Sequence, residues 1–185
     1  MIRLLPLLFL FLCTHVAQAN EPHKATISEI VDGDTVFISP PFKDGNEIRL
    51  VGIQAPKLPL GRKNFSIWPL AQESKIAIET LSLGKRVMLS FGGARRDRYG
   101  RWLAHINVQN NDNTETWIQG ELLWLGLARV YSFPDNRSRV SEMLALERDA
   151  RQAQRGIWAL PYYAIRNSDV DTLNDQLGTF QLIKG

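Results

Sequence analysis

The chain has 185 residues, of which 44% are hydrophobic and 22% are charged, so it is long enough to bury a core of its own. Its formal net charge of +3 is small and argues against a general basic coat of the kind that binds nucleic acid without specificity. Any affinity for anions is therefore expected from a local cluster of basic residues.

Residues 1–19 have the pattern of a secretory signal peptide. Arg3 supplies the positive start, residues 4–13 form an apolar run, and Ala17-Gln18-Ala19 forms a small-residue cleavage site. The apolar run is too short to span a membrane as a helix, and we expect no transmembrane segment. We expect export to the periplasm or the exterior after cleavage near Ala19. The mature chain would then lack cysteine, because Cys13 is the only one.

Short extended segments dominate the first half of the expected domain, residues 20–163. Apolar alternation and turn residues between the segments predict strands at 24–31, 35–39, 47–53, 86–91 and 101–108. The sequence of residues 40–46, which includes Pro40-Pro41, predicts a turn. A loop over residues 56–67 leads to a helix that begins near Trp68-Pro69 and ends at Gly84.

Helical spacing of apolar residues predicts two further helices, at 116–130 and at 138–155. In the second of them, the residues at helical spacing, expected on the inner face, are Val140, Met143, Leu144, Ala150 and Ala153. Residues 164–185 form a polar tail whose end resembles the start of a strand. Five short strands with helices packed on and after them indicate an α+β domain built on a small barrel.

Asp32 and Asp34 flank Gly33 between the first two predicted strands. Carboxylates two residues apart on an extended chain project from the same face, which suits a hard cation. The same residues are common turn formers, so a turn without a ligand is the alternative. Arg49 and Arg101 lie in or at the start of strands, and a guanidinium presents a planar fork that matches phosphate oxygens.

Three segments resemble the staphylococcal nuclease (thermonuclease) family: Val31-Asp32-Gly33-Asp34-Thr35-Val36, the segment from Ile48 to Lys57, and Asp97-Arg98-Tyr99-Gly100-Arg101. The resemblance covers about residues 24–160. It implies a five-stranded OB-fold β-barrel with three α-helices, and hydrolysis of phosphodiesters with Ca²⁺, two arginines and a carboxylate base.

Residue by residue, the resemblance assigns Asp34 to the metal, with Asp32 and Thr35 nearby. It assigns Arg49 and Arg101 to the phosphate, as binding and catalytic residues. The second segment usually ends in Asp-x-Pro-Glu but here reads Gln54-Ala55-Pro56-Lys57. Gln54 therefore stands at a metal-ligand position and Lys57 at the position of the general base.

These two replacements change the chemistry that the family pattern implies. Gln54 still offers a carbonyl oxygen, whereas the ammonium of Lys57 offers only donors. The local charge rises by about +3, because one negative charge is removed and another is exchanged for a positive one. Loss of a positioned base typically lowers a rate by about 10²–10⁴-fold. The sequence therefore predicts a weakened Ca²⁺ site and reduced hydrolysis.

Two positions for the ammonium of Lys57 are open: against Asp34, where the cation would sit, or extended into solvent. Glu47 and Glu73 are alternative bases that the sequence does not place. His105 is expected to be a structural or surface residue, and Trp102 is the strongest tryptophan candidate for a ligand contact.

Three functions remain open. The first is an exported domain that recognises phosphodiesters or nucleic acid with reduced or absent hydrolysis. The second is an active Ca²⁺-dependent nuclease in which Asp34 and Gln54 hold the metal, and the third is a protein-binding OB-fold module. The expected partners are nucleic acid or nucleotide phosphates. The basic clusters Arg62-Lys63 and Arg95-Arg96 either follow a phosphate backbone or serve solubility.

Overall fold

The computed structural model describes residues 23–168 and 181–184, so the predicted signal peptide and most of the polar tail lie outside it. The elements, in chain order, are β1 (His23–Asp32), β2 (Thr35–Phe42), β3 (Gly45–Leu50), β4 (Ile53–Gln54), α1 (Ala71–Ser82), β5 (Arg86–Ser90), β6 (Trp102–Gln109), β7 (Glu115–Trp117), α2 (Ile118–Trp124), β8 (Arg129–Val130), α3 (Val140–Gln152), the 3₁₀ turns η1 (Gly156–Ala159) and η2 (Pro161–Tyr163), β9 (Ile165–Asn167) and β10 (Leu182–Lys184). No helix in the described ranges has the length and hydropathy that a membrane span requires.

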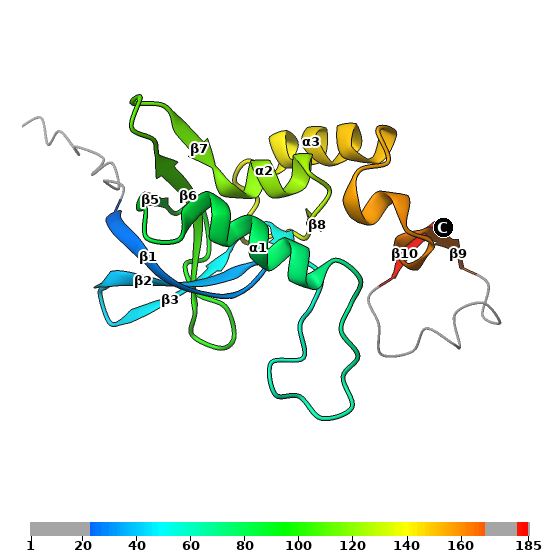
Figure 1. Ribbon diagram of the computed structural model, residues 1–185, viewed down its shortest axis with the longest axis horizontal. Helices are drawn as coiled ribbons and strands as arrows, with labels where there is room; N and C mark the ends of the chain where they lie inside the picture. The colour runs from blue at the N-terminus through cyan, green and yellow to red at the C-terminus, as the bar shows by residue number, and fades with distance from the viewer. Residues whose placement is uncertain (1–22, 169–180, 185) are drawn as a thin grey trace, which may run out of the picture.

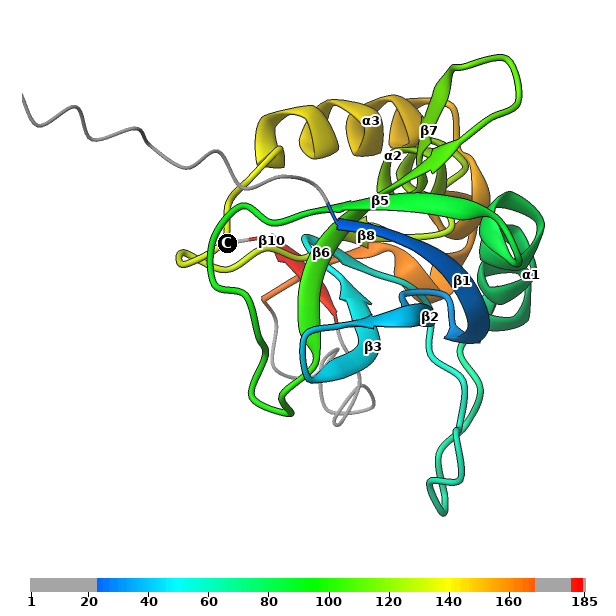
Figure 2. The ribbon, with the colours of Figure 1, turned by 90° about the vertical axis from the view of Figure 1, so that its left-hand side faces the viewer.

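Five strands close into a barrel, seen end-on in Figure 2. β3, β2, β1, β5 and β6 pair in that order as antiparallel neighbours, and a parallel pairing of β3 with β6 closes the ring. The closing register sets Ile48 opposite Trp102 and Leu50 opposite Ala104. The helices α1, α2 and α3 pack outside the barrel (Figure 1). The α+β fold with a five-stranded OB-type barrel and three helices, expected from the sequence, is confirmed.

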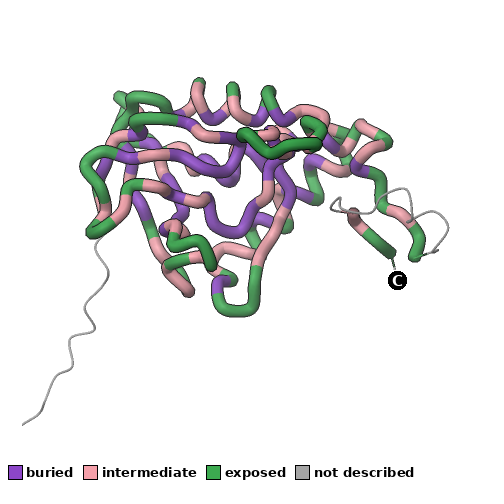
Figure 3. The backbone as a smooth tube through the Cα atoms, turned by 90° about the horizontal axis from the view of Figure 1, so that it is seen from below, coloured by how far each residue is buried: buried purple, intermediate pink, exposed green. Residues whose placement is uncertain are grey.

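The core fills the barrel and the space under the helices, where the buried residues gather in Figure 3. Alternation along the strands turns Ile27, Ile38 and Ile106 inward, and each is at most 1% exposed. Full burial of each such side chain stabilises the fold by about 1.5–3 kcal/mol. Leu122 of α2 and Met143 of α3 extend the same core. This rigid barrel carries the residues described below.

The structure corrects three details of the predicted elements. The predicted helix 116–130 is wrong at both ends, because β7 precedes the seven residues of α2 and β8 follows them. Gly126 adopts φ +68, which is incompatible with a continuing helix. Residues 40 and 41 continue β2, so the predicted turn starts later. Leu144 is 46% exposed and Ala153 is exposed, not inward as expected.

Candidate functional site

The turn between β1 and β2 packs closely against Ala55 and Ser74. A Cβ on Gly33 would lie 2.6 Å from the Cβ atoms of both Ala55 and Ser74, so only glycine fits there. This packing buries the flanking carboxylates: Asp34 is 0% exposed and Asp32 is 3% exposed. The Asp34 amide donates to Asp32 Oδ1 at 3.0 Å, and the Ala55 amide donates to Asp34 Oδ2 at 2.8 Å. The turn therefore presents two buried acids side by side.

Lys57 inserts its ammonium between these acids. Its Nζ lies 2.7 Å from both carboxylate oxygens of Asp34 and 3.3 Å from Asp32 Oδ2. Of the two positions considered for this side chain, the one against Asp34 is therefore observed. Arg49 adds a second ion pair, with Nη2 at 3.2 Å from Asp34 Oδ2. The four side chains form a cluster with two negative and two positive charges.

The pKa values of the two acids move in opposite directions. Burial alone raises the pKa of Asp34, but the charges of Arg49 and Lys57 outweigh it and lower this pKa to about 2. Burial, followed by the negative charge of Asp34, raises the pKa of Asp32. Asp34 is consequently the fixed anion of the cluster, and it holds the ammonium of Lys57 by a charge-assisted contact.

Gln54 is held by an arginine that sequence reasoning did not identify. The antiparallel register of β4 and β8 sets Gln54 directly opposite Arg129. Arg129 donates to Gln54 Oε1 from Nη2 at 2.7 Å and from Nε at 3.1 Å. Burial lowers the pKa of Arg129 to about 10, so it remains charged at neutral pH. The amide oxygen of Gln54 is thus engaged by a cation.

Arg49 and Arg101 are brought to one side of the cluster. Arg49 donates from Nη1 to the carbonyls of Asp34 and Leu50 and from Nη2 to that of Ile53, which fixes its guanidinium firmly. Arg101 pairs with Asp97, with both Nε and Nη2 at 2.7 Å from Oδ2. Arg101 keeps 25% of its side chain exposed, against 12% for Arg49. Arg101 is the more accessible of the two.

Thr35 connects this pair to the acids. Its hydroxyl donates to Asp34 Oδ1 at 3.3 Å and accepts from Arg101 Nη1 at 3.5 Å. The sequence-predicted residues Asp32, Asp34, Thr35, Arg49, Gln54, Lys57 and Arg101 therefore come together at one end of the barrel. Their roles in binding or catalysis remain predictions.

All of these residues except the buried Asp34 and Thr35 line a cleft of about 690 Å³ between the loop after β4, the β5–β6 connection and the segment after β8. Six basic side chains line it: Arg49, Lys57, Arg62, Arg96, Arg98 and Arg101. Three acidic side chains also line it: Asp32, Asp97 and Asp135. The lining therefore carries an excess of positive charge, which favours anions over cations in the cleft.

Aromatic side chains stand at the rim of the cleft. Tyr99 is 75% exposed and Phe133 is 50% exposed, and Tyr131 lines the wall beside them. Tyr131 and Phe133 follow β8 in a segment without periodicity, so the sequence carried no signal that would bring them here. The combination of basic and aromatic residues suits a ligand with phosphates and planar rings.

Several other candidates lie elsewhere. Glu47 and Glu73 do not line the cleft, and neither is placed to act as a replacement base. Trp102 does not line the cleft; it is 6% exposed and packs against Phe42 in the core. His105 is buried, with Nε2 at 2.9 Å from Ser138 Oγ, and burial lowers its pKa to about 4. It is a structural residue.

Across residues 23–168 and 181–184, no group of three or more His, Cys, Asp or Glu side chains is arranged to hold a metal ion.

Comparison with known proteins matches residues 47–160 to the family model described as staphylococcal nuclease homologue. Endonuclease YncB of Bacillus subtilis is 32% identical, over 79% of this chain and 70% of its own length. The thermonuclease of Staphylococcus intermedius is 25% identical, over 71% and 74%. An uncharacterised protein of Methanocaldococcus jannaschii is 28% identical, over 78% and 76%. Two longer Bacillus subtilis endonucleases also match, but this chain spans only 12% and 43% of them. The chain belongs to the staphylococcal nuclease homologue family.

Proposed function

We propose that this protein binds the phosphodiester backbone of nucleic acid in its cleft without Ca²⁺ and does not hydrolyse it. The observation that carries the proposal is the position of Lys57, whose ammonium contacts both oxygens of Asp34. A tethered cation takes the place that a mobile divalent ion would need. The family membership supports a nucleic acid as the ligand.

The donor set of the cluster does not fit Ca²⁺. That ion takes six to eight oxygen ligands, of which carboxylates supply the compensating charge. Asp34 already has Lys57 and Arg49 as ion-pair partners, and Gln54 Oε1 accepts two bonds from Arg129. A calcium ion would have to displace Lys57 and would still face the guanidinium groups of Arg49 and Arg129.

Binding of the phosphate falls chiefly to Arg101, with Arg49 as the fixed positive charge behind it. Arg101 is oriented by Asp97 and partly exposed to the cleft, which suits a charge-assisted bond to a phosphate oxygen. Lys57 adds a third positive charge to the lining of the cleft. Lys57 stands where the family pattern has its carboxylate base, so an attacking water lacks a proton acceptor at that position.

The test measures the binding of a single-stranded DNA oligonucleotide by fluorescence anisotropy, in EDTA and in millimolar Ca²⁺, together with cleavage on a gel. We expect binding that is equal in both buffers and lost in Arg101→Ala, and no cleavage. Ca²⁺-dependent binding with cleavage would establish an active nuclease instead. Absence of binding would leave the protein-module function. Cleavage that persists in Arg101→Ala would indicate a contaminant.

A gain-of-function variant tests whether the rest of the site can still support metal binding. The double variant Gln54→Asp, Lys57→Glu restores the carboxylates that the family pattern contains. We expect it to acquire Ca²⁺ binding in calorimetry, whereas the parent shows none. If the parent binds Ca²⁺ as tightly as the double variant, the assignment of Lys57 to the cation position is wrong.

A further inference from the structure

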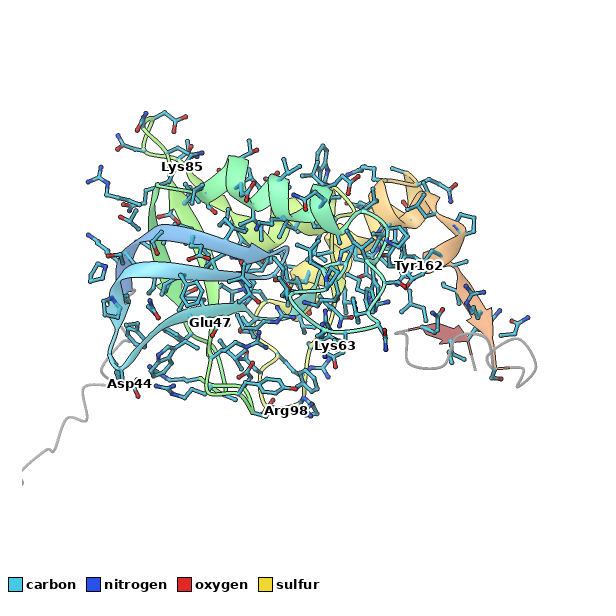
Figure 4. The ribbon with its side chains drawn as sticks, turned by 60° about the horizontal axis from the view of Figure 1, so that its bottom comes forward. Asp44, Glu47, Lys63, Lys85, Arg98 and Tyr162 are labelled. Atoms are coloured by element: carbon cyan, nitrogen blue, oxygen red, sulfur yellow. The ribbon has the colours of Figure 1, made fainter. Side chains whose placement is uncertain are left out.

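The loop between β4 and α1 carries a surface that the cleft does not account for. The loop extends below the barrel in Figure 1 and contributes Leu60 and Arg62 to the cleft wall. Residues 58–70 include Arg62 and Lys63 but no acidic residue. In the view of Figure 4, Lys63 lies between Arg98, beside the cleft, and Tyr162 of η2. The loop therefore leads away from the cleft with a positive charge along it.

Planar side chains form a row along this loop. The guanidinium of Arg62 lies 3.6 Å from the ring centroid of Phe65. Phe65 stacks toward Trp68 with centroids 6.3 Å apart and planes inclined by 22°, and Trp68 is followed by Tyr162 at 6.4 Å. Phe65, Trp68 and Tyr162 are all half-buried, so each retains an accessible part. We call Arg62, Phe65, Trp68 and Tyr162 the loop platform.

The loop platform is held in shape before any ligand arrives. Arg62 Nε donates to the carbonyl of Pro59 at 3.0 Å, and Nη2 donates to that of Leu58. At the far end, Tyr163 Oη donates to the carbonyl of Pro69 at 2.7 Å, which ties η2 to the loop. A surface ordered in advance loses little conformational entropy on binding.

We propose that the loop platform binds the continuation of a single-stranded nucleic acid whose backbone occupies the cleft. Unpaired bases stack on aromatic rings without regard to sequence, and basic residues beside them follow the phosphates. The row of rings and the positive charge of Arg62 and Lys63 match both parts of such a strand. A duplex keeps its bases stacked inside and cannot use the rings. This inference rests on the proposed function, because the cleft fixes where the strand begins.

The test compares a dinucleotide, which fills only the cleft, with an oligonucleotide of about ten nucleotides, within the range of site sizes of single-strand binding domains. Phe65→Ala removes one ring of the platform that does not line the cleft. We expect the parent to bind the longer strand more tightly than the dinucleotide. We expect Phe65→Ala to weaken the longer strand about five- to tenfold, at the lower end of values for stacked bases, and to leave the dinucleotide unchanged.

A second variant distinguishes the loss of base stacking from a change in the structure of the loop. Trp68→Phe keeps a ring in the row and should retain the affinity for the longer strand, while part of the tryptophan quenching on binding disappears. Equal affinity of Phe65→Ala and the parent for the longer strand would overturn the proposal. It would also be overturned if the parent bound the dinucleotide as tightly as the longer strand, or bound a duplex of the same length as tightly as the single strand. Failure of the proposed function differs, because the parent would then bind neither length.

Discussion

Replacement of Lys57 by methionine tests whether its ammonium neutralises the buried acids. Methionine retains most of the side-chain length but leaves Asp32 and Asp34 with Arg49 as the one remaining partner of the cluster. Removing one member of a buried ion pair costs about 3–5 kcal/mol, since it strands an uncompensated charge. The side chain of Lys57 is 18% exposed and Arg49 remains in place, so we expect a loss of about 3 kcal/mol in the free energy of unfolding.

The assay is urea unfolding followed by circular dichroism at neutral pH. Lys63→Met, on the exposed part of the same loop, is the matched control and should change the free energy of unfolding by less than about 0.5 kcal/mol. A double-mutant cycle with Asp34→Asn completes the test. Because the two side chains touch, we expect a coupling energy of about 2 kcal/mol. A Lys57→Met variant as stable as the parent, or a coupling energy near zero, would refute the reasoning.

Two further predictions concern stability. The pKa of His105 is lowered from 6.5 to about 4 by burial, beside Arg139 and Glu142, so the unfolded state binds a proton first as the pH falls. The free energy of unfolding should fall by up to about 3 kcal/mol between pH 6.5 and pH 4. In urea titrations at several pH values, His105→Gln should lack this part of the pH dependence, and an equal pH dependence in the variant and the parent would contradict the prediction. Gly33→Ala should cost about 1–3 kcal/mol by overpacking against Ala55 and Ser74, and Ala55→Gly in the same chain should restore part of it. An unchanged melting temperature in Gly33→Ala would show that the turn is loosely packed.

The fold could be predicted largely from the sequence, and the grouping of the site residues in part. Apolar alternation located the barrel strands, because burial on one face imposes a period of two. The segments of the resemblance supplied Asp34, Arg49 and Arg101, which the barrel brings together. Helix α2 was overextended, since the apolar residues around Gly126 have helical spacing although the glycine ends the helix.

The parts of the site that escaped prediction depend on contacts between distant segments. Arg129 meets Gln54 through a two-residue pairing of β4 with β8, too short to leave a pattern in the sequence. Glu147 of α3 is 6% exposed, and its carboxylate accepts from the Val130 amide as well as from Arg151, a contact that helical spacing alone does not indicate. Tyr131 and Phe133 reach the cleft through an irregular segment. Such placements are set by tertiary packing and not by local periodicity.

The ammonium between Asp32 and Asp34 also constrains the order in which substitutions could convert this site into a metal site. Lys57→Glu alone would set a third carboxylate beside two buried ones with Arg49 as the one cation left in the cluster, and repulsion would destabilise the fold. Gln54→Asp alone would pair with Arg129 and gain nothing for a metal while Lys57 remains. Each single step is thus unfavourable or silent, and only the combination is productive. The order therefore matters: Gln54→Asp first leaves the cluster of Asp32, Asp34 and Lys57 intact, whereas Lys57→Glu first passes through a variant that folds less well.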